Sequence, residues 1–332
     1  MFALPHHLSR KGIIGLNQRN AGIILPFNDR KKYPLVDDKA QTKKLAIAAG
    51  LAVPELYGDI AYAGQVKQFP SIIEGHREFV IKPAQGAGGD GIIVIKNRFG
   101  EYFQKANGQL VDQDTLLFHI QNALGGVFSL GGQPDRVLIE YCVQFDPVFE
   151  RISYQGVPDV RVIVFLGVPI MAMVRLPTRM SDGRANLHQG AIGTGVDLSC
   201  GHTLSAVWMN KVVDRHPDTL EPVSGVQIPH WDQILDISAR TWELTGLGHQ
   251  GVDKLPTRRG CNPVWTACWP TAMNLKRPSN GWPLRASILR PVHSQASDNK
   301  ERTMSLSTQR RRFLQSCGAL AVGGPAAFGQ AF

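Results

Sequence analysis

Residues 78–96 read EFVIKPAQGAGGDGIIVIK, and this stretch decides the fold. The β-branched and aromatic residues at 79–81 and 92–95 predict two strands, and the glycines between them predict a flexible loop. No helix follows the glycines, so the stretch is neither a P-loop nor the dinucleotide-binding fingerprint. It predicts a β-hairpin with a glycine loop at its turn.

The glycine loop is a candidate phosphate-binding element. It consists of Gln85, Gly86, Ala87, Gly88, Gly89, Asp90 and Gly91. Glycines let backbone N–H groups approach phosphate oxygens closely. Lys82, on the strand before the loop, can reach phosphates as a point charge. A mobile hairpin turn without a ligand is the alternative, and the loop taken alone favours that alternative.

The other predicted elements are helices and strands in mixed order. They are a helix within residues 34–58, a helix over 112–124, a strand over 136–143, a hairpin over 158–177 that turns at Gly167, an amphipathic helix over 231–247 and the start of a strand at 248–253. This order predicts an α+β fold.

Two further groups of residues carry candidate chemistry. Glu140 and Tyr141 end an apolar strand, where backbone groups and an acid could hold adenine and ribose. Arginine, asparagine and histidine side chains follow on the next hairpin and loop, at Arg161, Arg175, Arg184, Asn186 and His188. Planar guanidiniums can stabilise the negative charge that develops in phosphoryl transfer through bidentate hydrogen bonds. An ordinary strand end and a solvated basic loop are the respective alternatives.

Five motifs occur together in the order found in the ATP-grasp superfamily. They are FVIKPAQGAGGDGIIVI, VLIEYCV, DVRVIVFLGVPIMAMVRL, RANLHQGAIGTG and GVD. Residues 33–253 therefore resemble an ATP-grasp domain. Within the superfamily, the loop 184–190 is similar to glutamate-adding members, and residues 35–58 resemble the alpha-L-glutamate ligase-like subgroup.

The resemblance implies an ATP-grasp fold, in which two α+β lobes clasp ATP. It also implies an ATP- and Mg²⁺-dependent ligase that joins a carboxylate to an amine through an acyl phosphate, with an amino acid, a peptide end or a small amine as acceptor. It implies catalytic roles for Arg161, Arg184 and Asn186, and Asp253 as the first Mg²⁺ ligand. It implies that ATP is bound by Lys39, Lys82, Gln85, Gly86, Gly88, Gly89, Glu140, Tyr141, Asp159, Arg175 and His188.

The chain departs from this family after Asp253. Members continue with a strand that carries a Glu and an Asn, followed by Arg-Pro-Gly, whereas the next acid here is Asp298. Because proline interrupts the following residues so often, we expect the strand to stop at Asp253. Loss of the remaining oxygen ligands for Mg²⁺ would impair ligation.

The charge distribution also separates the end of the chain. Residues 1–254 hold 25 basic and 25 acidic side chains and are therefore neutral. Residues 255–332 carry the whole net charge of +9. Residues 304–332 resemble a twin-arginine export signal, which acts at an N-terminus. We interpret residues 1–32 as a short basic N-terminal segment, 33–253 as the ATP-grasp domain and 254–332 as a non-family tail, disordered or frame-shifted. A genuine basic extension is the alternative.

Two other functions compete with the ligase. One is a nucleotide-binding protein that no longer turns over. The other is a nucleic-acid-binding protein that stacks bases on Trp265, Trp269 and Trp282, which the neutral body of the chain disfavours. The five scattered cysteines, the lack of an apolar run of about 18 residues and the lack of a secretory signal lead us to expect a cytoplasmic protein with no membrane partner.

Overall fold

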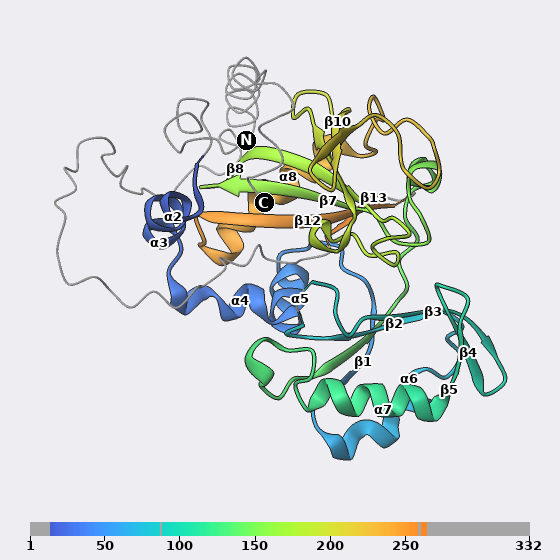
Figure 1. The fold of residues 1–332 in the computed structure, drawn as a ribbon. Helices are drawn as coiled ribbons and strands as arrows, with labels where there is room; N and C mark the ends of the chain where they lie inside the picture. The colour runs from blue at the N-terminus through green and yellow to red at the C-terminus, as the bar shows by residue number, and fades with distance from the viewer. Residues whose placement is uncertain (1–13, 87, 258–259, 264–332) are drawn as a thin grey trace. The chain divides into compact units, whose positions relative to one another are not determined.

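The computed structural model describes residues 14–86, 88–257 and 260–263, and these residues fold around two antiparallel sheets (Figure 1). Helices pack on each sheet, as the α+β prediction requires. Among the described residues, no helix combines the length and the apolar character needed to cross a membrane.

The first sheet has six strands and contains the predicted glycine hairpin. Its order is β1 (Leu56–Ile60), β6 (Val137–Glu140), β2 (Phe79–Pro83), β3 (Ile93–Phe99), β4 (Tyr102–Lys105) and β5 (Leu110–Asp112). Strands β2 and β3 pair antiparallel, with Phe79 opposite Ile95. The hairpin prediction is therefore confirmed.

Helices cover one face of this sheet. They are the 3-10 turn η3 (Ala63–Gln68), α6 (Phe69–Ile72) and α7 (Gln113–Leu124). The Asp112 side chain caps α7 by accepting from Thr115 N at 2.9 Å. Leu116 and Ile120, one turn apart, are fully buried against Phe79 and Ile81. The predicted helix over 112–124 thus closes the first core.

The second sheet has seven strands. Its order is β11 (Lys211–Val213), β10 (Thr203–Trp208), β9 (Ile192–Val196), β8 (Val168–Leu176), β7 (Asp159–Phe165), β12 (His249–Thr257) and β13 (Gly260–Pro263). Helix α8 (Trp231–Thr245) lies behind β7, β8 and β12 in Figure 1. It buries Ile234 and Ile237 in the same core as Val160, Val162 and Val252. Because side chains alternate along a strand, Asp159 and Arg161 lie on the opposite face of β7.

Helix α5 (Lys39–Ala48) belongs to both cores. Asp38 caps it by accepting from Ala40 N at 2.8 Å. Ala40 packs with Ala84, which follows β2, and with Leu138 of β6, whereas Ala46 lies in the core of the second sheet. The preceding short helix is α4 (Pro34–Asp37).

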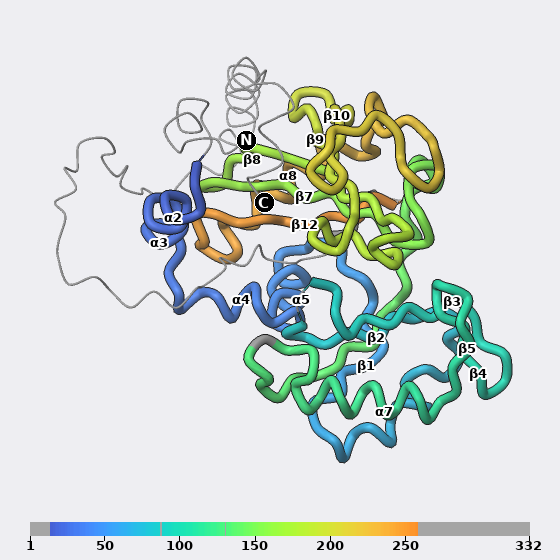
Figure 2. Tube along the Cα trace, in the orientation of Figure 1, coloured from blue at the N-terminus to red at the C-terminus, as the bar shows by residue number. Residues whose placement is uncertain are grey.

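Residues 14–32 pack on the second sheet. They form short helical turns: α2 (Leu16–Arg19), η1 (Asn20–Ile24), α3 (Leu25–Phe27) and η2 (Arg30–Lys32). Figure 2 follows these blue residues to the start of the orange strand β12. There, Asn28 donates Nδ2 to His249 O at 2.7 Å and accepts from His249 N at 2.8 Å. The described part of the N-terminal segment is therefore tied to β12.

The expectation that the strand stops at Asp253 is wrong. Strand β12 continues to Thr257 and pairs with β13, Pro256 lying opposite Cys261. Its pairing with β7 ends at Lys254, so the missing N–H of Pro256 breaks no bond to that neighbour, and the carbonyl of Pro256 accepts from Asp146 N at 3.0 Å. The expected tail lies outside the described residues from position 264 on.

The strand expected over 136–143 is shorter than predicted. It ends at Glu140, and Tyr141 N then donates to Glu55 O at 2.9 Å.

Candidate functional site

A buried carboxylate at the end of strand β6 in the first sheet lies between two lysines. Glu140, on β6, pairs through Oε1 with Lys43 Nζ at 2.5 Å and through Oε2 with the Lys82 ammonium. Lys82 lies on β2 and faces away from the core residues Phe79 and Ile81. Lys43 follows Lys39 by one turn on α5, so both project from one face of the helix. The three lysines and one glutamate carry a net positive charge beside the glycine loop.

Lys39 holds the start of the glycine loop. Its Nζ donates to Gly86 O at 2.6 Å and to Ala84 O at 3.1 Å. Burial, followed by the charge of Lys82, lowers the pKa of Lys39 to about 8. The expected contact of Lys39 with phosphate remains a proposal, because two of its three donors bind the backbone carbonyls of Ala84 and Gly86 in this structure.

Two further side chains fix the ends of the glycine loop. The carboxylate of Asp135 accepts from Gln85 N at 2.9 Å. At the other end, His119 Nε2 lies 2.8 Å from Gly91 O, and a Cβ on Gly91 would meet the Phe128 ring at 2.5 Å. Gly91 also has a φ of +75°, which a side chain would strain. Both ends of the loop are therefore anchored by side chains.

The tip of the glycine loop is contacted by the loop that follows β8. Asn186 Nδ2 donates to Gly88 O at 3.3 Å, and Arg184 Nη1 lies 3.2 Å from Asp90 Oδ1. Gly88 and Gly89 both have positive φ. Two regions that the sequence suggested separately as phosphate-binding therefore meet in the folded chain.

Four charged residues form a quartet across strands β8, β7 and β12, in which Asp253 is buried and the other three are mostly buried. Arg161 donates to both oxygens of Asp253, at 2.6 and 2.7 Å. Arg175 donates Nε to Asp159 Oδ1 at 2.6 Å, pairs with Asp159 Oδ2 as well, and reaches Asp253 Oδ2 at 2.8 Å. The strand register explains the pairing, because Arg175 lies opposite Asp159 and Arg161 lies opposite Asp253.

The quartet shifts the acidity of its members in opposite directions. Burial raises the pKa of Asp159 to about 6, although Arg175 opposes that shift. Burial also pushes the pKa of Asp253 upward, but Arg161 and Arg175 overcome it and leave the pKa below its ordinary value. Asp253 is therefore held as a carboxylate by two guanidiniums.

The described residues do not fit a Mg²⁺ site. Both oxygens of Asp253 accept from guanidiniums, and no group of three or more His, Cys, Asp or Glu side chains within the described ranges could hold a metal ion. Mg²⁺ prefers several oxygen ligands in octahedral geometry. The expectation that Asp253 begins a metal site therefore gains no support from its surroundings.

The other expected site residues lie at the periphery. The side chain of Tyr141 is exposed after the end of β6, and His188 is exposed in the 3-10 turn η6 (Leu187–Gln189). Sequence reasoning missed Lys43, His119 and Asp135. The spacing of Lys43 from Lys39 could have revealed it, whereas His119 and Asp135 carry no local pattern.

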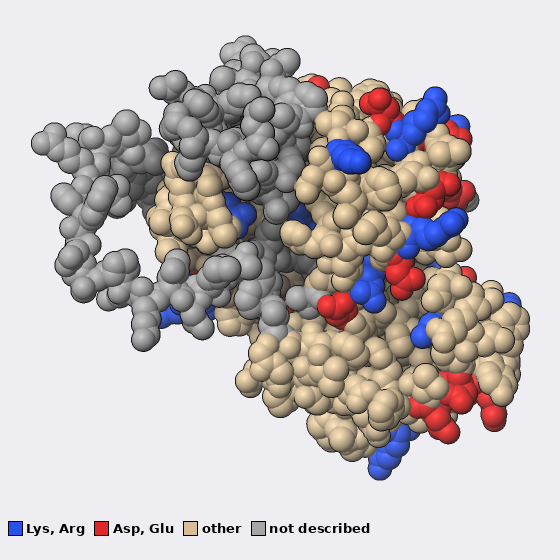
Figure 3. Space-filling view, in the orientation of Figure 1, with Lys and Arg blue, Asp and Glu red and all other residues tan. Residues whose placement is uncertain are grey.

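The face drawn in Figure 3 bears on the nucleic-acid alternative. Lys and Arg side chains there are interspersed with Asp and Glu, and the described residues on this face form no continuous basic surface. The expected stacking residues Trp265, Trp269 and Trp282 lie outside the described residues.

A family model described as sugar-transfer associated ATP-grasp matches residues 18–262 of this chain. The match covers the first sheet, the second sheet up to residue 262, the two loops that meet and the charged quartet. No curated protein matches the chain significantly.

Several solved structures are similar at low identity. D-alanine–D-alanine ligase from Bacillus anthracis complexed with ATP is 12% identical, with a TM-score of 0.40, over 75% of this chain and 60% of that chain. VanG D-Ala:D-Ser ligase from Enterococcus faecalis is 14% identical, with a TM-score of 0.40, over 72% and 54%. ATP-grasp ligase PsnB complexed with minimal precursor is 16% identical, with a TM-score of 0.35, over 71% and 52%. The chain thus spans between 52% and 60% of these structures' length.

Proposed function

Because this chain belongs to the family of sugar-transfer associated ATP-grasp proteins, we propose that it binds ATP and uses it to join a carboxylate to an amine. The γ-phosphoryl group would pass to the carboxylate, and the amine would then displace phosphate from the acyl phosphate. The alpha-L-glutamate ligase-like subgroup suggested by the sequence remains part of this proposal.

The observation that carries the proposal is the contact between the two loops. Asn186 and Arg184 reach Gly88 and Asp90, so guanidinium and amide donors lie at the tip of a loop whose backbone can cradle phosphates. Lys82 and Lys39 place positive charge at the base of the same loop. Negative charge that develops on a transferring phosphoryl group would find donors on both sides.

Each expected residue then has a task that its position allows. Lys82, Lys39 and the loop at Gln85, Gly86, Gly88 and Gly89 would bind phosphates. Glu140 and Tyr141, where the chain leaves β6, would hold the nucleoside. Arg184 and Asn186 would stabilise the acyl-phosphate step, with His188 beside them on the same loop.

The charged quartet of Asp159, Arg161, Arg175 and Asp253 would act mainly by fixing the polar face of β7, β8 and β12. Its guanidiniums are already used by its carboxylates.

The family description widens the range of substrates to test. It associates members with sugar transfer, so uronic acids join amino acids as candidate carboxylates, and amino sugars join amino acids and peptides as candidate amines.

The test is ADP release by the full chain, given ATP, magnesium and pairs drawn from this panel. We expect ADP release that requires both a carboxylate and an amine. Lys82→Met should abolish it, and Lys211→Met, at an exposed position on β11, should not. ADP release that requires neither the carboxylate nor the amine, or equal activity in the two variants, would contradict the proposal.

A nucleotide-binding protein without turnover is the second candidate. The environment of Asp253 favours it, because guanidiniums occupy both carboxylate oxygens. Under this candidate, calorimetry detects ATP binding that Lys82→Met weakens, while no substrate pair produces ADP.

A further inference from the structure

The loop that carries Arg184 and Asn186 is closed at its neck by buried hydrogen bonds. It leaves β8 at Pro177 and returns to β9 at Ala191. Thr178 Oγ1 donates to Gly190 O at 2.8 Å, and Trp208 Nε1 donates to the same carbonyl at 2.9 Å. Thr178 is fully buried. The two ends of the loop are thereby fastened to each other and to β10.

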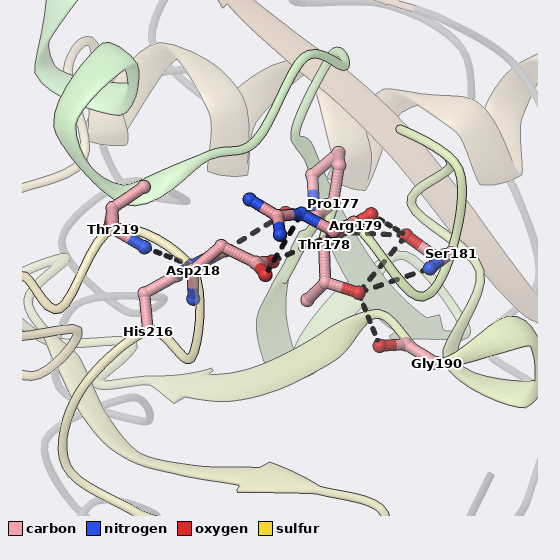
Figure 4. Close-up of polar contacts among 8 residues, drawn as sticks. All are labelled: Pro177, Thr178, Arg179, Ser181, Gly190, His216, Asp218 and Thr219. Atoms are coloured by element: carbon pink, nitrogen blue, oxygen red, sulfur yellow. Dashed lines mark hydrogen bonds and ion pairs between the residues drawn. The ribbon is translucent and has the colours of Figure 1, made fainter.

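A reciprocal pair of hydroxyl bonds shapes the first turn of the loop, as Figure 4 shows. Thr178 N donates to Ser181 Oγ at 2.9 Å, and Ser181 N donates to Thr178 Oγ1 at 3.1 Å. Ser181 Oγ also lies 3.0 Å from Thr178 O, to which it donates. Arg184 N then donates to Ser181 O at 3.0 Å, so the turn leads directly into the arginine.

A buried histidine from a distant turn holds the start of the loop. His216 Nε2 lies 2.9 Å from Pro177 O, while its Nδ1 lies 3.1 Å from Asp218 N and 3.2 Å from Thr219 N (Figure 4). Because two backbone N–H groups point at Nδ1, that nitrogen accepts. The proton therefore sits on Nε2, which donates to Pro177 O. This assignment fixes the neutral tautomer of His216.

The turn that carries His216 makes a second link to the same loop. Arg179 N donates to Asp218 Oδ2 at 2.7 Å, and the Arg179 side chain lies 3.9 Å from Asp218 Oδ1. The turn itself is closed by His216 N, which donates to Glu221 O at 2.9 Å. The turn thus contacts both Pro177 and Arg179, on either side of Thr178.

We propose that His216 is a positioning residue, which holds the loop of residues 177–190 so that Arg184 and Asn186 face the tip of the glycine loop. His216 touches neither Arg184 nor Asn186 directly. It acts through Pro177, Asp218 and the neck at Thr178. Its effect on turnover depends on the proposed function, whereas its effect on the loop does not.

Protonation of His216 should loosen the loop. A second proton on Nδ1 would face the N–H groups of Asp218 and Thr219, replacing attraction with repulsion. The charged groups around the ring are Asp218, Arg179, Arg215, which donates to Leu220 O, and Glu221, which pairs with Arg151. Burial lowers the pKa of His216, while the hydrogen bond to Pro177 O and then the charge of Asp218 oppose the shift.

The sign of the pH effect follows. The folded pKa of His216 lies below that of a free histidine, about 6.5. The anchored form is therefore fully populated above that pH and is lost as pH falls through the lower, folded value.

Hydrogen exchange on the full chain tests the proposal without requiring turnover. Asparagine at 216 can keep an acceptor near Nδ1 but cannot donate to Pro177 O, whereas glutamine can keep that donor. We expect His216→Asn to speed exchange at residues 181–190 by at least about tenfold, as loss of about 1.4 kcal/mol of anchoring would, with no change at 161–175. His216→Gln should lie closer to wild type at neutral pH. It should also lack the faster loop exchange that we expect of the wild type at acidic pH, after correction for intrinsic rates.

Two further comparisons separate positioning from general stability. His202→Gln, at an exposed histidine outside the loop, should leave exchange at 181–190 unchanged. Thr178→Val removes the hydroxyl at constant shape and should reproduce the effect of His216→Asn, while Thr178→Ser should restore wild-type exchange. Unchanged loop exchange in His216→Asn, or equal acceleration across 161–175, would overturn the proposal.

Turnover supplies the functional comparison. In His216→Asn we expect kcat to fall about tenfold or more while KM for ATP changes less than about threefold, because the glycine loop and Lys82 are untouched. If wild type releases no ADP with any substrate pair, the proposed function fails while the exchange result still decides the role of His216. If wild type turns over and the variant retains full kcat, the loop contact is not needed and the positioning role is refuted.

Discussion

The guanidinium of Arg184 lies 3.2 Å from the carboxylate of Asp90, which is 94 residues earlier in the sequence. Both side chains remain about half exposed, at 44% and 56%. An exposed ion pair of this kind contributes little to stability, typically below about 1 kcal/mol. The contact therefore serves to place Arg184 rather than to hold the fold together.

This relationship predicts a separation of stability from activity. Arg184→Ala should change the free energy of unfolding by less than about 1 kcal/mol but should lower ATP-dependent turnover by about 10²-fold or more. Urea denaturation and ADP release measure the two quantities. Arg77→Ala, at an exposed arginine outside both loops, is the matched control and should lose far less turnover. A variant that is strongly destabilised yet turns over normally would show that the contact stabilises the fold and is not needed for activity.

Lys82→Met should weaken ATP binding by about 1.5–3 kcal/mol, the range for a hydrogen bond to a charged group. Lys43 still pairs with Glu140 in this variant, so the buried carboxylate keeps one partner. Calorimetric titration of wild type and variant with ATP gives the difference. Equal affinities would remove Lys82 from the phosphate site.

Lys39 predicts how ATP affinity depends on pH. Its folded pKa is about 8, so the ammonium is lost as pH rises above that value. If phosphate binding uses the charge, affinity should fall by up to about tenfold between pH 8 and 9. Lys39→Gln keeps donors for Ala84 O and Gly86 O without titrating, and its affinity should be lower and flat over this range.

Unfolding would not explain that loss of affinity. An unfolded lysine titrates near 10.4, so between about pH 8 and 10.4 the unfolded chain binds more protons at this position. This group alone therefore makes the fold more stable as pH rises through that window. A wild-type affinity that stays constant from pH 7 to 9 would show that the charge of Lys39 is not used.

The sequence predicted the elements whose patterns are local. Runs of β-branched and aromatic residues on both sides of the glycines predicted the β2–β3 hairpin, and the helix predicted over 112–124 is α7. The order of the motifs along the chain predicted the ATP-grasp superfamily. The family match over the same elements confirms that prediction. The alpha-L-glutamate ligase-like subgroup rested on looser similarity and remains a proposal.

Contacts between distant segments could not be predicted in this way. Nothing in the residues around Arg184 specifies Asp90 as its partner, and nothing around His216 specifies Pro177. The end of β12 was misjudged because proline was taken as a strand breaker. Pro256 is tolerated because the pairing of β12 with β7 does not extend beyond Lys254.

Replacement of Asp253 should lower the stability of the fold rather than abolish binding of a metal ion. Asp253→Asn leaves Arg161 and part of Arg175 without their carboxylate, and breaking a buried pair typically costs about 3–5 kcal/mol. Asp232→Asn, at an exposed position on α8, should cost less than about 0.5 kcal/mol. Urea denaturation with and without EDTA should give the same values for wild type. Marked destabilisation by EDTA would mean that Asp253 serves a metal after all.

The end of β12 predicts where the chain can be shortened. Truncation after Pro263 should change the free energy of unfolding by less than about 1 kcal/mol, because every described strand is kept. Truncation after Lys254 removes the buried Leu255 and Thr257 and the whole pairing with β13. It also removes the contacts of Asp146 N with Pro256 O and of His230 with Thr257 O.

Burying a leucine side chain contributes about 1.5–3 kcal/mol and each hydrogen bond about 0.5–1.5 kcal/mol, so the shorter chain should lose at least about 3 kcal/mol. Thermal and urea unfolding of the two truncated chains, each compared with the full chain, measure the difference. Leu255→Ala in the full chain is a milder control and should lose about 2–4 kcal/mol. Equal stability of the two truncated chains would show that the domain ends at Asp253 and that residues 254–263 add nothing to it.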